Sequence, residues 1–203
     1  MQDAVQDARP TGANVGMRHA GALGEVRAAT RATHEALDAA LPDGLHGFED
    51  YTRYLGALLP LAQWLADSWS PTWPAELACW RDSERVDFLR ADLAALHAPA
   101  CSSAVAGAVT PAEWLGGCYV MEGSALGARV LARDVDALER SHPEVAGARR
   151  FMRHLARDPR RWRCFAGLLD ALPAEAVADA VRGARRGFAM VHRNLDPHGV
   201  VVA

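Results

Sequence analysis

The sequence predicts an all-α protein, a single-domain bundle of several helices. Through most of the chain, apolar residues recur at three- and four-residue steps, the spacing of one face of an α-helix. No segment alternates apolar and polar residues with period two, so no β-sheet is expected. No repeat of about 20–50 residues is present, which argues against a helical solenoid. A length of 203 residues is typical of one domain with a substantial core.

The first half of the chain divides into a tail and a set of helices. Residues 1–20 show no clear period and are expected to form a flexible N-terminal tail, with the helical domain over 21–198. The apolar pattern predicts a helix from Leu23 to Leu41, ended by Pro42–Asp43–Gly44. A second helix is expected over 48–68, where Pro60 should kink it or split it in two. A loop over 69–74, a short helix through Trp80 and a helix over 84–96 follow.

The second half begins with a clear helix start. Thr110 is placed to cap the helix, Pro111 to take its first position and Glu113 to act as the acid of a capping box. That helix should continue to about Arg140. Two or three further helices are expected, over about 143–157, 159–171 and 174–194, and Pro159 sits at a plausible first position of the second of these ranges.

Composition and charge restrict the class of protein. Half of the residues are hydrophobic and the formal net charge is −3, so an electrostatic nucleic-acid binder is not expected. No apolar run is long enough to span a membrane, and the N-terminus lacks the apolar core of a secretory signal. The four cysteines are scattered without a CxxC pair, which fits a cytoplasmic protein without structural disulfides. All 22 cationic side chains are arginines, so any anion is bound by guanidinium groups.

A stripe of polar side chains follows the first predicted helix. Arg27, Arg31, His34 and Asp38 are spaced by four, three and four residues, so they share one face. His34 could ligate a metal through one ring nitrogen while Asp38 accepts the proton of the other, and the two arginines could reach carboxylates. From the spacing alone, a solvated helix face is the simpler interpretation.

The long helix after Thr110 carries two glycines one turn apart. Gly123 and Gly127 flank Ser124, and each glycine costs about 1 kcal/mol relative to alanine inside a helix. Something must offset that cost. Close packing of a second helix is one explanation and the simpler one; close approach of the backbone to a planar ligand is the other.

Together the two features resemble the heme oxygenase family. The segment Arg27–Ala–Ala–Thr30–Arg31–Ala–Thr–His34 is similar to the family's proximal helix, and residues 119–130 (YVMEGSALGARV) are similar to the distal helix of its bacterial branch. Arg161–Trp162 and the final helix with Phe188 resemble the family's C-terminal pattern more weakly. The resemblance spans about residues 23–195, with the motifs in the family's order.

The resemblance implies a role for each matching residue. His34 matches the axial iron ligand, and Gly123 and Gly127 match the glycines that cover the opposite face of the heme. Ser124 stands where animal members have an aspartate that organises distal water. Arg27 and Arg31 match basic residues that face the heme propionates, and Arg185 is given the same part from the last helix. The tyrosine that some members offer to a propionate has no secure match: Cys118 falls near its position and Tyr119 follows it.

The implied activity is oxidative cleavage of heme to biliverdin, with release of iron and carbon monoxide. Heme is then both cofactor and substrate, and the reaction needs O2 and an external electron donor, a ferredoxin or a reductase. The distal motif resembles the subgroup that supplies biliverdin to a bacteriophytochrome. Two alternatives stay open: a heme-binding or heme-trafficking protein without turnover, and a different enzyme of the same helical architecture, since fold alone does not give function.

Overall fold

The computed structural model describes residues 21–41, 44–45, 47–100 and 109–195, without the side chains of residues 129 and 130. The expected tail over 1–20 and the last residues of the domain predicted to end at 198 lie outside this range. Within it the chain forms α-helices, two 3-10 helices and no strand, as predicted. The α-helices are α1 (Ala22–Ala40), α2 (Phe48–Asp67), α3 (Glu84–Ala95), α4 (Pro111–Ser141), α5 (Arg150–Ala156), α6 (Arg161–Asp170) and α7 (Ala174–Leu195); the 3-10 helices are η1 (Ala75–Trp80) and η2 (Pro143–Gly147).

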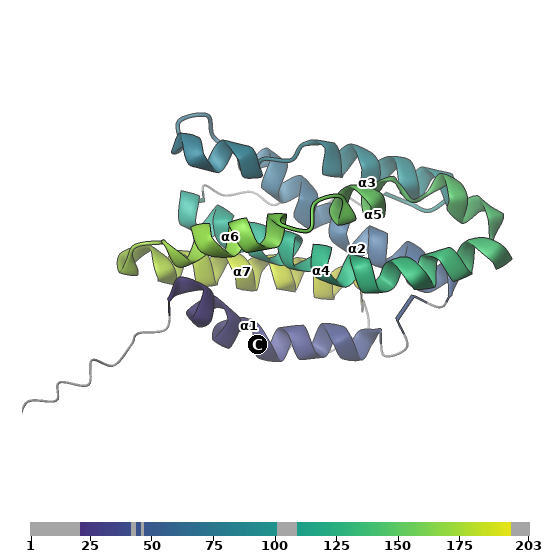
Figure 1. The fold of residues 1–203 in the computed structure, drawn as a ribbon, viewed down its shortest axis with the longest axis horizontal. Helices are drawn as coiled ribbons and strands as arrows, with labels where there is room; N and C mark the ends of the chain where they lie inside the picture. The colour runs from purple at the N-terminus through teal and green to yellow at the C-terminus, as the bar shows by residue number, and fades with distance from the viewer. Residues whose placement is uncertain (1–20, 42–43, 46, 101–108, 196–203) are drawn as a thin grey trace, which may run out of the picture.

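The bundle is organised around α7. This helix packs against α1, α2 and α4, while α3 and α5 pack on the side of α2 and α4 away from α1 (Figure 1). Figure 1 shows α1 along one edge of the bundle and α3 along the opposite edge. Among the described helices, none is long and apolar enough to cross a membrane.

Glycines let α4 and α7 approach closely. A methyl group on Gly116 of α4 would overlap the carbonyl of Ala180 in α7, and one on Gly183 of α7 would overlap the carbonyl of Glu113 in α4. Only glycine fits where two helix backbones come this near. The first two turns of α4 are therefore held rigidly against α7.

The start of α4 follows the sequence prediction for Thr110 and Pro111. Thr110 caps it, and its hydroxyl oxygen accepts a hydrogen bond from the backbone N–H of Glu113 at 3.1 Å. The Glu113 carboxylate, expected to complete a capping box, instead binds Arg186 of α7 at 3.2 Å. This pair joins the first turn of α4 to α7.

Two details of the predicted helices were wrong, and at Pro60 one of two expected outcomes is excluded. Pro60 does not split α2: the helix continues through it, because the neighbouring Leu59 and Leu61 are completely buried and their packing offsets the lost hydrogen bond. The single helix expected over 143–157 is η2 followed by α5. Pro159 is not a first helical residue, since α6 begins two residues later, at Arg161.

Candidate functional site

A cavity of about 770 Å³ lies between α1 and α4. Both helices pack on α7, and the space between them stays open over the apolar face of α7. Its walls are mostly apolar, with a few polar groups, as in small-molecule sites of this volume. The lining residues come from α1 (Arg27, His34, Leu37, Asp38), α2 (Tyr54, Leu58), α4 (Tyr119, Val120, Gly123, Ser124, Leu126, Gly127, Leu131), α6 (Trp162), α7 (Phe188, Val191, Leu195) and the α1–α2 connection (Leu41, Gly44).

His34 stands on the α1 wall of this cavity. Its Nδ1 lies 3.0 Å from a carboxylate oxygen of Asp38, one helical turn later. The imidazole meets the ring of Phe188 edge-on, with centroids 6.0 Å apart, and its side chain is 60% exposed. With Nδ1 engaged by a carboxylate, the tautomer that donates from Nδ1 is favoured, and Nε2 is left with a lone pair that can bind a metal.

Gly123 and Gly127 stand on the α4 wall. A methyl group built on Gly127 meets no atom within 4 Å, and one on Gly123 meets only the Trp162 ring, at 3.8 Å. Close packing of a second helix, the simpler explanation of this glycine pair from the sequence, therefore does not account for the two glycines. Close backbone packing in α4 occurs at Gly116 instead.

Ser124 lies between the two glycines, and its hydroxyl is turned partly to its own helix. The hydroxyl donates a hydrogen bond to the carbonyl of Met121 at 2.7 Å. While that bond lasts, the oxygen can accept a hydrogen bond from a molecule in the cavity but cannot deliver its own proton.

The three predicted arginines take different positions. The Arg27 guanidinium lies over the Trp162 ring, 5.9 Å from its centroid, at the wall of the cavity. Arg31 lines an adjoining open hollow of about 480 Å³, shared with Arg27 and His34. Arg185 lies outside both lining sets: its Nε donates to the carbonyl of Ala29 in α1 at 3.4 Å. The structure thus brings Arg27 and Arg31 to the site and places Arg185 against the backbone of α1, outside the cavity and the hollow.

The structure places Cys118 and Tyr119 in different surroundings. Tyr119 lines both the cavity and the adjoining hollow. Cys118 is buried on another face of α4, and burial, together with the nearby Glu122 carboxylate, raises the pKa of its thiol well above the ordinary value. A thiol that stays protonated is a poor metal ligand.

Two aromatic residues, Tyr54 and Trp162, line the cavity although neither was given a role in the site from the sequence. Tyr54 of α2 faces the cavity, and burial raises the pKa of its phenol, so the hydroxyl stays protonated. Trp162 of α6 contacts the ring of Tyr119, with centroids 5.8 Å apart, and borders Gly123. Tyr54 sits in an ordinary amphipathic pattern that carries no signal of a site, whereas Trp162 belonged to the weak C-terminal resemblance.

The cavity fits a flat, largely apolar ligand that carries a metal and acidic groups at one edge. A metal-binding imidazole is on one wall, and on the other wall the Gly127 backbone is bare and borders open space. The guanidinium of Arg27 at the wall and that of Arg31 in the adjoining hollow are suited to carboxylates. Heme has these properties, so the residues present fit heme.

Comparison with known proteins finds similarity to heme oxygenases. Over 118 residues the chain is 37% identical to a heme oxygenase of Xanthomonas campestris pv. campestris (strain 8004), which covers 57% of this chain and 70% of the relative. The solved structure of the NO- and CO-bound heme oxygenase from Neisseria meningitidis superposes with a TM-score of 0.67 and 25% identity, covering 90% of this chain and 95% of that one. No family model matches the chain.

Proposed function

The chain belongs to the heme oxygenase family, and from that premise we propose that heme lies in the cavity between α1 and α4 with His34 as its axial iron ligand. Heme is both cofactor and substrate of the family. The activity of the chain is oxidative cleavage of heme to biliverdin with release of iron and carbon monoxide. One observation carries the proposed site: His34 and the bare glycine pair form opposite walls of one cavity.

On the proximal side, Asp38 is proposed to set the state of the ligand. Its carboxylate, 3.0 Å from Nδ1 of His34, holds the imidazole in one orientation and leaves Nε2 for the iron. A neutral imidazole ligand, rather than a thiolate, suits chemistry in which the porphyrin ring is the substrate. Bound heme supplies the iron at which O2 is activated and the ring that is opened.

On the distal side, α4 is proposed to act through its backbone. Gly123 and Gly127 would let the helix lie over a bound ring and leave room for O2, which any side chain there would occupy. Ser124 accepts a hydrogen bond from water there, since its own proton is donated to Met121. Protons therefore reach the site through water held by this segment, not from the serine hydroxyl itself.

The arginines are proposed to orient the ring. Arg27, supported by the Trp162 face, and Arg31 in the adjoining hollow would bind the propionates of heme and so orient the ring. Arg185 contributes indirectly in this proposal. Its bond to the Ala29 carbonyl holds the part of α1 that lies between the other two arginines.

We further propose O2 as oxidant, an external ferredoxin or reductase as electron donor, and a bacteriophytochrome as the acceptor of biliverdin. The donor follows the practice of the family, and the phytochrome rests on the resemblance of the segment Tyr119–Val130 to that subgroup. The cytoplasmic location expected from the sequence remains a prediction.

The test combines binding and turnover. Purified protein titrated with hemin should give a Soret band, and ascorbate or a reductase system in air should then produce biliverdin. His34→Ala should weaken the iron complex and abolish turnover, with added imidazole restoring the Soret band. His142→Ala, a matched control at an exposed histidine outside the cavity, should change neither.

Two results would contradict the proposal. Unchanged iron ligation in His34→Ala would show that the axial assignment is wrong. A stable heme spectrum without biliverdin under several reductants would replace the enzyme by a heme-binding protein on the same fold.

A further inference from the structure

A network of buried charged side chains lies directly behind the distal segment. Glu122 of α4, only 1% exposed, accepts a hydrogen bond from Arg85 of α3 at 2.7 Å. It also accepts two from Arg161 of α6, at 2.8 and 2.9 Å, in a bidentate pair. A carboxylate bound by two guanidiniums in this way has fixed geometry as well as neutralised charge.

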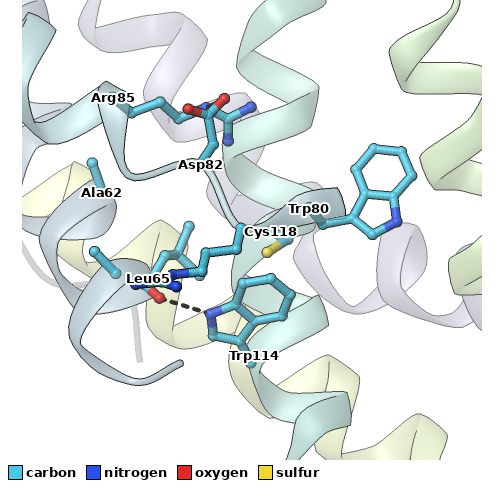
Figure 2. Close-up of a pocket in the computed structure, with 9 residues that line it drawn as sticks. Ala62, Leu65, Trp80, Asp82, Arg85, Trp114 and Cys118 are labelled. Carbon is cyan, nitrogen blue, oxygen red and sulfur yellow. Dashed lines mark hydrogen bonds and ion pairs between the residues drawn. The ribbon is translucent and has the colours of Figure 1, made fainter. Parts of the chain in front are cut away.

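The network continues away from α4. Asp82 lies 3.2 Å from Nε of Arg85 and 2.7 Å from Nε2 of His154 in α5. Figure 2 shows Asp82 and Arg85 side by side above Cys118 and Trp114, around a gap of only about 10 Å³. Two carboxylates and two guanidiniums balance in charge, and the network joins α3, α4, α5 and α6.

The network is not part of the cavity wall. Glu122, Arg85 and Arg161 are absent from its lining, although Glu122 and Arg161 each directly precede a lining residue, Gly123 and Trp162. The bonds between the Glu122 carboxylate and Arg161 therefore fix the positions of Gly123 and Trp162, which line the cavity, from the side away from it. Such fixing is needed because Gly123 and Gly127 have no side chains that could anchor this turn of α4.

Stability alone does not explain a buried ionic network. A well-packed apolar set of similar volume is often as stable or more so, whereas removal of one partner leaves an uncompensated buried charge. What the bidentate pair adds over apolar packing is a defined distance between α4 and α6. That distance sets how close the Trp162 ring lies to Gly123, a gap of 3.8 Å measured from a methyl built on the glycine.

We propose that Glu122 is a positioning residue: through its pair with Arg161 it holds the distal segment 123–128 and Trp162 at the spacing that selects which meso edge of the ring is cleaved. The effect on which meso edge is cleaved rests on the proposed function. The effect on the position of segment 123–128 concerns the chain alone and is measurable without heme. Arg27, which stacks on Trp162, connects the same spacing to the proposed propionate contact.

Amide hydrogen exchange of the whole chain tests whether Glu122 holds segment 123–128 in place. Glu122→Gln keeps the shape of the side chain but leaves a net buried positive charge. Amide protection over 123–128 should fall by about tenfold or more, while protection over 111–117 and in α7 should stay unchanged. The matched control is Glu113→Gln on the same helix, which removes the Arg186 pair outside the cavity and should leave 123–128 unchanged.

The isomers of biliverdin then test the selectivity. The parent should give one predominant isomer and Glu122→Gln a mixture, while Glu122→Asp, which keeps the charge, should restore part of the selectivity. If Glu122→Gln unfolds globally, Arg161→Gln serves instead, because Arg161 is 19% exposed and Arg85 still neutralises Glu122. Unchanged protection over 123–128 in the variant that folds overturns the proposal. Lost protection with an unchanged isomer ratio overturns the proposed effect on which meso edge is cleaved, and no biliverdin from the parent points to the proposed function instead.

Discussion

Gly127→Ala should make the protein more stable and less able to bind heme. The glycine lies inside α4, and a methyl built on it meets no atom within 4 Å, so no clash opposes the substitution. Alanine is better than glycine in a helix interior by about 1 kcal/mol. For a chain of this size, that gain corresponds to a rise in Tm of roughly 2–4 °C in the absence of heme.

The same methyl enters the space proposed for the ring. A methyl group on Gly127 would take up space proposed for the ring and its bound O2, and overpacking by one methyl costs about 1–3 kcal/mol. The affinity for heme, or the rate of ring opening, should therefore fall by roughly 5- to 150-fold. Stability and binding are thus expected to change in opposite directions.

Thermal unfolding of the heme-free protein and hemin titration are the two assays. The control is Gly116→Ala on the same helix, which should lower the Tm because its methyl overlaps the Ala180 carbonyl. A lower Tm in Gly127→Ala would refute the structural argument that Gly127 faces open space. A higher Tm with unchanged heme affinity and turnover would refute the placement of the ring against this wall.

Three further predictions concern charge, pH and a buried hydroxyl. Arg27→Ala should weaken hemin binding by up to about fivefold, more than Arg185→Ala does, because only Arg27 lines the cavity; equal effects in a titration would contradict this ranking. Burial opposes ionisation of Asp82, but the hydrogen bond from His154 and nearby guanidiniums lower its pKa below 3.8. The stability that the ionised Asp82 contributes is fully present above its ordinary pKa and is lost as the pH falls through the lowered pKa of the folded protein. The Tm of Asp82→Asn should therefore fall less steeply than that of the parent when the pH is lowered below about pH 5. An equally steep fall in Tm would contradict the lowered pKa of Asp82. Tyr51→Phe, which removes a 2.5 Å hydrogen bond to a buried backbone carbonyl, should cost about 1 kcal/mol in urea unfolding, and an unchanged midpoint would show that the bond contributes nothing.

Local signals in the sequence were sufficient for most of the fold. The cap at Thr110 and the periodic apolar residues of α1 and α2 predicted helix ends to within a residue or two. Where the sequence left two outcomes open, tertiary packing decided: α2 is not split at Pro60, because buried leucines surround it. The short turn between η2 and α5 is fixed by Asp92 of α3, whose buried carboxylate accepts the backbone N–H of Arg150 at 3.1 Å. A contact between residues so far apart leaves no local signal.

The site was predictable only in part, for a similar reason. His34 and the glycine pair were found because each belongs to a motif of fixed spacing. That they line one cavity depends on how α1 and α4 pack on α7, which spacing within either helix does not contain. Tyr54 and the network around Glu122 are assembled from separate helices, so no single segment points to them.

The close backbone contacts of Gly116 with Ala180 and of Gly183 with Glu113 have a consequence for how relatives of this chain are compared. Each position excludes every side chain, so selection should keep both glycines as strictly as the pair at Gly123 and Gly127. Equal conservation would then have two different origins, one in helix packing and one in the ligand. A mutational scan that measures cellular abundance beside activity would separate them: alanine should deplete the protein at the first pair and only its activity at the second.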